Sequence, residues 1–101
     1  MATNLTWTGT TQYTDGKPYT QADHGGYEVE VNGVVGIAVP VAWDVDNQYT
    51  FPLADLPGVV QGANTVRMRT VSAAGVASEY TPLVSFEYRS VPQVPTNLAA
   101  E

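Results

Sequence analysis

The residues best suited to chemistry in this sequence are Asp44, Asp46 and Asn47, which form a D-x-D-N run. Carboxylate and amide oxygens at this spacing open calcium-binding loops, where a third acidic position, a glycine and a distal glutamate complete the coordination. Those further parts do not follow in this chain. A polar turn between two strands therefore explains the run better than a bound cation, and we expect neither a metal ion nor a cofactor.

His24 is the only histidine of the chain, and it lies in a polar segment beside Asp23. A zinc site needs several nitrogen or sulfur ligands, but the chain has no cysteine. We therefore expect His24 to be a solvated loop residue. Glu28 and Glu30 form a pair of carboxylates, yet such pairs arise in any acidic sheet and do not alone indicate glycoside hydrolysis. The sequence favours a protein that is not an enzyme.

Charge restricts the partners of the chain. Ten Asp and Glu against four Lys and Arg give the 101 residues a net charge of −6, which repels phosphate groups and anionic lipids. We therefore expect no nucleic acid and no membrane as partner. The first residues lack the charged and apolar regions of a secretory signal, which indicates folding in a cytoplasm.

Apolar and polar residues alternate along most of the chain, and turn signals interrupt the alternation at short intervals. This pattern predicts about six short β-strands. Asn32-Gly33 is the strongest turn signal, because a type I′ hairpin needs two residues with positive φ. The inward-facing side chains of the strands form the predicted core, which consists of Leu5, Trp7, Tyr27, Val29, Val31, Val66, Met68, Val84 and Phe86.

Outward-facing charges are expected to pair across neighbouring strands. Glu28 and Glu30 on one strand face Arg67 and Arg69 on another, and Glu87 lies on the far side of the arginines. Opposite charges at such positions stabilise a sheet by roughly 0.2–1 kcal/mol per pair and fix its register. A structural role accounts for this predicted ladder of charges.

Residues 34–43 form an unusually apolar predicted strand. Pro40 has no N–H for a sheet ladder, which favours a position at a sheet edge. The larger side chains are expected to enter the core, and they are Val35, Ile37, Val39, Val41 and Trp43. The opposite face carries Ala38, Pro40 and Ala42 and no charge, although charge usually protects an edge from pairing. This face is either covered by the rest of the chain or contacts another protein.

Several segments resemble the fibronectin type III domain, an antiparallel β-sandwich in which three strands face four. Leu5-x-Trp7 is similar to the second strand of that family, and residues 26–31 are similar to its third. Residues 49–58 resemble the fifth strand with its corner, and residues 66–75 resemble the sixth strand with its loop. The resemblance implies an all-β sandwich of six to seven strands.

Two parts of the family pattern are missing. The aromatic residue that follows the Pro-Gly corner is absent, so this corner must be fixed in another way. The family's first strand is absent at the N-terminus, whereas residues 94–100 resemble it. We therefore predict a sandwich at residues 1–90 and an extended arm at residues 91–101. The arm residues expected to contact a partner are Val91, Val94, Pro95 and Leu98.

Two interpretations of the arm remain open. Pro92 and Pro95 favour extended backbone, as in a linker or a frayed tail. Alternatively, the arm donates the missing strand and inserts Leu98 into an open core. In the family, the last strand ends at the pole opposite to the start of the first strand, which favours donation to a neighbouring chain.

These features lead to a structural hypothesis. A single domain of this family without signal or cysteine fits a small virion component of a tailed bacteriophage, such as a head decoration or tail accessory subunit. Its partners would be other protein subunits in a homo-oligomer or viral lattice. One alternative is a carbohydrate-binding or cell-surface adhesion module, in which Tyr13, Tyr19 and Trp43 would stack on sugars. Another is one bead of a longer modular extracellular protein.

Overall fold

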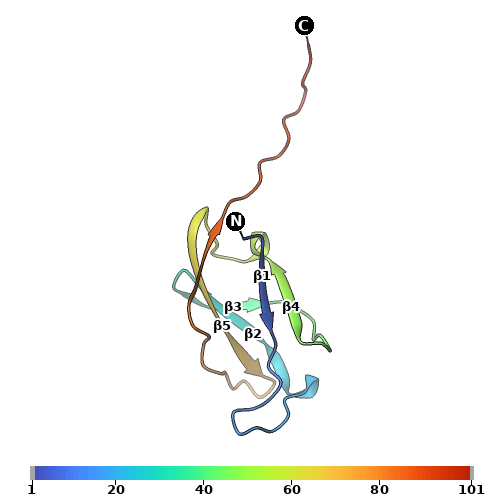
Figure 1. Ribbon diagram of the computed structural model, residues 1–101, viewed down its shortest axis with the longest axis vertical. Coiled ribbons are helices and arrows are strands. Elements are labelled where there is room, and N and C mark those ends of the chain that lie inside the picture. Colours follow the sequence, from blue (N-terminus) through green and yellow to red (C-terminus); the bar gives the residue numbers. More distant parts are fainter. Residues whose placement is uncertain (1, 101) are drawn as a thin grey trace.

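The computed structural model describes residues 2–100, and it confirms an all-β fold (Figure 1). Met1 and Glu101, the outer ends of the predicted sandwich and arm, lie outside the described residues. The strands are β1 (Asn4–Thr8), β2 (His24–Val31), β3 (Val34–Val39), β4 (Gln48–Pro52), β5 (Gly62–Ser72) and β6 (Val84–Tyr88). Two short 3₁₀ turns, η1 (Gln21–Asp23) and η2 (Leu53–Asp55), precede β2 and follow β4. None of the described segments is a helix of sufficient length and hydropathy to cross a membrane.

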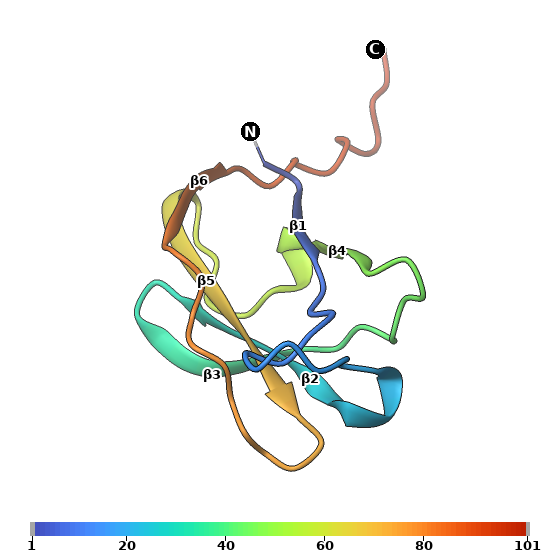
Figure 2. The ribbon, with the colours of Figure 1, turned by 60° about the horizontal axis from the view of Figure 1, so that its bottom comes forward.

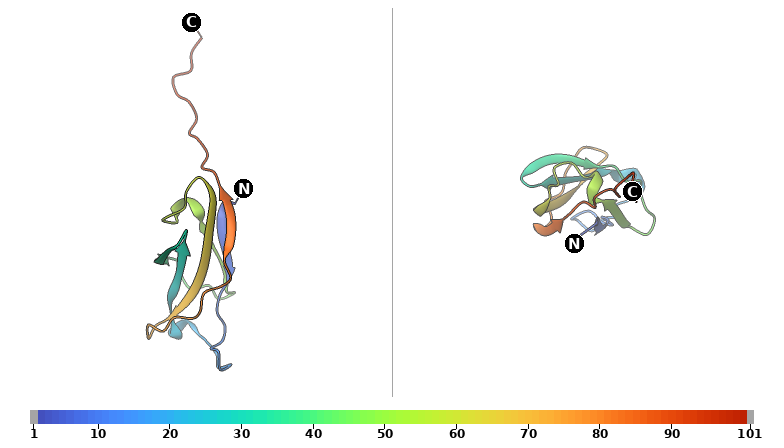
Figure 3. Two further views of the ribbon diagram at one scale, coloured as in Figure 1. Left: turned by 90° about the vertical axis from the view of Figure 1, so that its left-hand side faces the viewer. Right: turned by 90° about the horizontal axis from the view of Figure 1, so that it is seen from above.

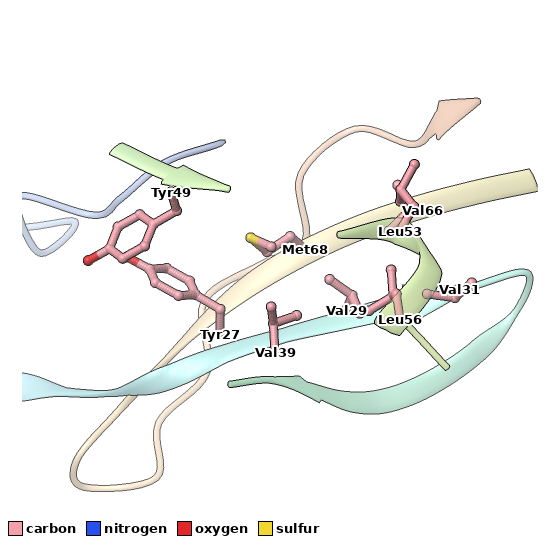
Figure 4. Close-up of a cluster of buried hydrophobic side chains, with 9 residues drawn as sticks. All are labelled: Tyr27, Val29, Val31, Val39, Tyr49, Leu53, Leu56, Val66 and Met68. Carbon is pink, nitrogen blue, oxygen red and sulfur yellow. The ribbon is translucent and has the colours of Figure 1, made fainter. Parts of the chain in front are cut away.

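The strands form two antiparallel sheets that face each other (Figures 2 and 3). One sheet contains β1 and β4, and the other has the order β3-β2-β5-β6. Side chains from both sheets and from η2 pack between them, as Figure 4 shows. Val29 and Val31 on β2 are fully buried, and Leu53 of η2 is 2% exposed. The core therefore lies between two layers, as the alternation of apolar residues predicts.

The hairpin between β2 and β3 has the predicted turn, because Asn32 has a φ of 50° and Gly33 a φ of 86°. The strand after the turn differs from the prediction. β3 ends at Val39, and Val35 is 61% exposed instead of entering the core. The pairing of β2 with β3 shifts by one residue near the turn, where Gly36 has a φ of 78°. The extra residue of this bulge turns Val35 away from the core, and Val34 at the start of the strand is 57% exposed as well.

The corner between β4 and β5 is fixed by two asparagines instead of an aromatic ring. Asn64 is 2% exposed, and its amide donates hydrogen bonds to the carbonyl oxygens of Val60 and Gly62 at 2.8 and 2.9 Å. Its Oδ1 accepts hydrogen bonds from the Val60 N–H at 2.8 Å and from Asn32 Nδ2 at 2.9 Å. Asn32 also donates to the Gly58 carbonyl at 2.9 Å. The two side chains therefore satisfy backbone groups that the corner would otherwise leave unpaired.

The predicted core residues divide into two groups. The five predicted core residues on β2 and β5 are all buried, but Leu5, Trp7 and Phe86 are only half-buried. Val84 does not join the core, because it is 53% exposed at the start of β6. These four residues lie on β1 and β6. Within residues 2–100, no further strand covers the space between these two strands, which explains their incomplete burial.

Candidate interaction site

The sandwich has two open strand edges that flank the same space. Within residues 2–100, β1 pairs only with β4, and β6 pairs only with β5. Near the start of β1, the Ala2 N–H donates a hydrogen bond to the Glu87 carbonyl of β6 at 3.1 Å. Farther along β1 the described residues form no ladder across this space. Unpaired edge groups of this kind are a template for an additional strand.

A groove of about 470 Å³ lies along this open edge of β1, and we call it the β1 groove. Its apolar lining includes Leu5, Trp7, Met68, Pro82 and Val84, and threonines and the charged side chains of Arg67, Arg69 and Glu79 line it as well. Trp7 stacks on Tyr49 at a centroid distance of 5.3 Å and an interplanar angle of 12°. Because a core side chain, Met68, lines the groove, this opening gives access to the interior between the two sheets.

The chain leaves β6 as an extended arm, of which residues 91–100 are described (Figures 1 and 3). Its apolar side chains face solvent, because Val91, Val94 and Leu98 are 88%, 85% and 97% exposed. Pro95 is exposed as well. The arm stretches the molecule to 71 Å along its longest axis. The arm therefore extends away from the sandwich, and the arm residues that we predicted to contact a partner do not pack in the chain's own core.

The edge of β3 carries the second set of predicted contact residues. Ala38 lies on β3, and Pro40 and Ala42 follow the strand directly. All three are exposed, whereas Val39 between them is buried. The alternation therefore holds beyond the bulge, and it leaves a small, uncharged strip at the outer edge of the larger sheet. The β1 groove lies on the other sheet edge, where a strand position is open, so this strip provides a weaker case for docking than the β1 groove.

The outward charges form two cross-strand pairs. Glu30 pairs with Arg67, and Glu28 pairs with Arg69 at 2.8 Å. The hydrogen bonds that Arg69 donates to the Glu28 carboxylate raise the pKa of Arg69 above its ordinary value. The Tyr80 ring covers both guanidinium groups, with centroid distances of 4.4 Å and 5.0 Å. Cation–π contact of this kind adds to the ion pairs, and the sequence pattern did not indicate Tyr80.

Glu87 does not belong to this ladder. The register of β5 and β6 places it opposite Ala63 instead of an arginine. Its carboxylate lies 3.4 Å from the guanidinium of Arg89, two residues later in the chain. The β6 ladder ends at the pairing of Val66 with Val84, so no residue of β6 lies opposite Arg67 or Arg69. The segment before Val84 bonds to β5 through loop contacts, such as the Thr81 N–H to the Met68 carbonyl at 2.8 Å.

His24 lies in an aromatic cluster at the start of β2, so it is not the solvated loop residue that we expected. It is half-buried, and its Nδ1 lies 2.9 Å from the hydroxyl of Tyr19. Its ring is 5.3 Å from that of Trp43 and 4.6 Å from that of Tyr27. Burial lowers the pKa of His24 from its ordinary value and raises the pKa of Tyr19 and of Tyr27. The histidine is therefore part of a packed end of the sandwich.

The tyrosines of this cluster do not present a platform for a sugar. Tyr13 is 40% exposed, whereas Tyr19 is only 6% exposed. Their rings meet edge to face at an interplanar angle of 69°. Trp43 is half-buried and tilted by 37° relative to Tyr19. Sugar stacking requires exposed flat ring faces, and these three rings do not offer two coplanar ones.

The D-x-D-N run forms a turn between β3 and β4, as predicted. The Asn47 N–H donates to the Asp44 carbonyl at 3.0 Å, and the Gln48 N–H donates to Asp44 Oδ2 at 3.0 Å. Asn47 has a φ of 55°, which asparagine tolerates better than most residues. Throughout residues 2–100, no group of three histidine, cysteine, aspartate or glutamate side chains is placed to hold a metal ion.

Comparisons with known protein families, with curated protein sequences and with solved structures found no match to this chain. The comparisons therefore give no support to the resemblance to fibronectin type III domains. What stands on the structure alone is a small all-β sandwich with sheets of two and four strands.

Proposed function

We propose that the protein is a non-enzymatic structural subunit that docks on other protein subunits. The observation that carries this proposal is an apolar groove on an open strand edge together with an exposed apolar arm. Soluble monomers rarely expose apolar residues in such contiguous arrangements without an interaction partner. The acidic surface, with a net charge of −6, favours a protein over nucleic acid as that partner.

The sandwich supports a rigid spacer role. Its core is packed between two sheets, and the paired charges and the asparagine corner fix the register of the larger sheet. A subunit of this kind holds its contacts with neighbouring subunits at a fixed spacing, because a packed interior resists deformation. The side chains around Asp44 and His24, the best candidates for chemistry, serve a turn and a packed cluster. This arrangement favours assembly over catalysis.

We further propose a fibronectin type III-like sandwich that acts as a small virion component of a tailed bacteriophage, either a head decoration or a tail accessory subunit. The strand orders β1-β4 and β3-β2-β5-β6 correspond to that family's two sheets without the first strand. Small β-sandwich domains recur in such particles, and this step is an analogy at the level of the fold. The location would be the virion.

The test is the composition of particles released by cells that carry the gene in its native context. Particles are purified by density gradient, and their proteins are identified and counted by quantitative mass spectrometry. The proposal expects this chain at many copies per particle, in a fixed ratio to the main shell or tube protein. Its absence from the particles, with the chain recovered only in the soluble fraction or on cell surfaces, would contradict the virion role.

A further inference from the structure

We propose that the β1 groove is filled by residues 91–100 of a second copy of this chain, which add a strand antiparallel to β1. The inference rests on the proposed assembly role and names its partner. The occupant is a segment with no charged residue among these ten positions. The floor of the groove that receives it is apolar, with Trp7 and Met68, and its rim also carries threonines and the charged side chains of Arg67, Arg69 and Glu79. Strand addition of this kind uses backbone hydrogen bonds for affinity and side-chain pockets for specificity.

The chain exposes more surface than a compact monomer of its mass. Its accessible surface is 6998 Å², and its radius of gyration is 17.4 Å. The usual scaling predicts about 5,500 Å² and about 13 Å for a compact chain of this size. The surplus of roughly 1,500 Å² is the area that a standard protein–protein interface buries. The arm and the groove thus leave exposed about as much surface as one stable contact needs.

The arm sequence suits an edge strand with one apolar face. In an extended segment, Val94 and Leu98 lie on the same face, because side chains alternate with period two. Pro95 lies on the opposite face. On β1, Thr3 and Gly9 bond toward β4, so the alternate residues Asn4, Thr6 and Thr8 carry the backbone groups of the open edge. In the antiparallel pairing these groups face Asn97, Pro95 and Gln93, and the ladder lacks only the N–H of Pro95. That pairing would direct Val94 and Leu98 toward Trp7, Met68 and Val84 in the groove.

The direction of the arm favours a neighbouring copy over the chain's own groove. β6 ends beside the start of β1, as the hydrogen bond between Ala2 and Glu87 shows (Figure 1). A strand antiparallel to β1 must enter the groove at the opposite end, near Thr8. To do so in its own groove, the arm would first have to pass along the whole sandwich and then return. Its ten residues span only about 33 Å when extended, which covers the groove once.

Donation to a neighbour requires no such return. The arm continues along the long axis of its own sandwich, away from the pole where β6 ends (Figure 3). A second copy placed above, in the same orientation, presents the Thr8 end of its groove to this arm. The arm then runs antiparallel to the second copy's β1 without reversing. The contact is head to tail, so repeated donation builds an open chain of subunits unless rotation closes a ring.

Two full-length variants test donation by complementation. Leu98→Asp places a charge on the arm face that would enter the groove, and Val84→Arg places a charge in the groove wall. Each variant alone should lose self-association, with a Kd raised about 100-fold or more, because a buried unpaired charge is costly. Mixed in equal amounts they should form a dimer, because the first variant still accepts an arm and the second still donates one. Analytical ultracentrifugation measures the three samples.

Matched controls lie one residue away from each substitution. Ala99→Asp adds the same charge to the opposite face of the arm, and Leu83→Arg adds the same charge beside the groove, where Leu83 is 60% exposed and lies outside the lining. Both controls should associate like the unchanged chain. Association that fails equally in the controls would overturn the assignment of the arm face and the groove wall.

Cysteine pairs test the direction, because the chain has no cysteine of its own. In the antiparallel arrangement, Gln93 lies near Thr8 and Asn97 lies near Asn4. A chain with Gln93→Cys and Thr8→Cys should form disulfide-linked oligomers on oxidation, and a chain with Gln93→Cys and Asn4→Cys should form few. The two β1 positions are four residues apart, about 13 Å, which exceeds the reach of a disulfide.

Three results would overturn the inference. The first is an unchanged chain that stays monomeric at roughly 100 μM, well above a micromolar Kd. The second is a disulfide between Gln93→Cys and Thr8→Cys within a single chain, which would place the arm in its own groove. The third is association that survives both Leu98→Asp and Val84→Arg, which would assign the contact to another surface. Each of these leaves the virion role standing if the chain is present in particles, so the two proposals fail separately.

Discussion

The two flanks of the sandwich are built from the same kind of alternating strand, but they bury their side chains to different extents. On the flank of β2 and β5, Val29 is fully buried and Val66 is 2% exposed. On the flank where β1 and β6 have open edges, Val84, the cross-strand partner of Val66, is 53% exposed. Pairing fixes the register of a strand, whereas burial also requires an opposing layer. The open flank lacks that layer within residues 2–100.

The largest expected effect lies on the closed flank, at the asparagine corner. Asn64→Ala should lower the free energy of unfolding by about 3 kcal/mol, because it removes four hydrogen bonds and leaves partly buried groups of Val60, Gly62 and Asn32 without partners. Denaturant unfolding followed by circular dichroism measures the change. Asn4→Ala is the control, because the Asn4 side chain is exposed and its hydrogen bond goes to the neighbouring Thr3. This substitution should lower the free energy of unfolding by less than about 0.5 kcal/mol. Similar losses in the two variants would contradict the role of the corner.

A matched pair of valines compares the two flanks directly. Val66→Ala should destabilise the chain by about 2 kcal/mol, because it opens a cavity in a packed core. Val84→Ala, at the opposing position on β6, should cost less than about 0.5 kcal/mol at concentrations where copies are dissociated. Thermal unfolding of dilute samples measures both. Equal losses of unfolding free energy in dilute solution would mean that the chain itself covers Val84, and the contrast between the flanks would be wrong.

Much of the closed flank could be predicted from local sequence. Alternation of apolar residues identified the faces of β2 and β5, because a strand has a strict period of two. Asn32-Gly33 fixed the hairpin, because few other pairs accept two positive φ values. The pairing of Glu28 and Glu30 with Arg69 and Arg67 followed from the order of the strands. In each case the information lies in neighbouring residues or in one pair of strands.

The remaining features depend on contacts that no short pattern contains. The bulge near Gly36 turns Val35 away from the core, and nothing in an apolar run marks its position. Asn64 bonds to the backbone of Val60 and Gly62 beside it, but its fourth hydrogen bond comes from Asn32, which reaches the same corner from another hairpin. The ladder of β5 with β6 stops at Val84, so Glu87 does not reach the two arginines, and the Tyr80 ring contacts them instead. The open groove is visible only once both sheets are assembled, and the occupant that we propose for it, residues 91–100, remains a prediction.

The smallest expected effect concerns pH and the packed end of the closed flank. Burial lowers the pKa of His24 in the folded chain below its ordinary value of 6.5, so the unfolded chain binds the proton more readily. The stability that neutral His24 provides is fully present above pH 6.5. It declines as the pH falls from 6.5 through the lower pKa of the folded chain.

Unfolding measured from pH 8 to pH 5 should show this decline, and His24→Gln should reduce it without removing the hydrogen-bonding capacity toward Tyr19. Because Asp23 and the other carboxylates are unchanged in the variant, the difference between the two curves isolates the histidine. Identical curves would mean that His24 is as solvated in the folded chain as in the unfolded one, and that the packed end is as open to water as the β1 flank.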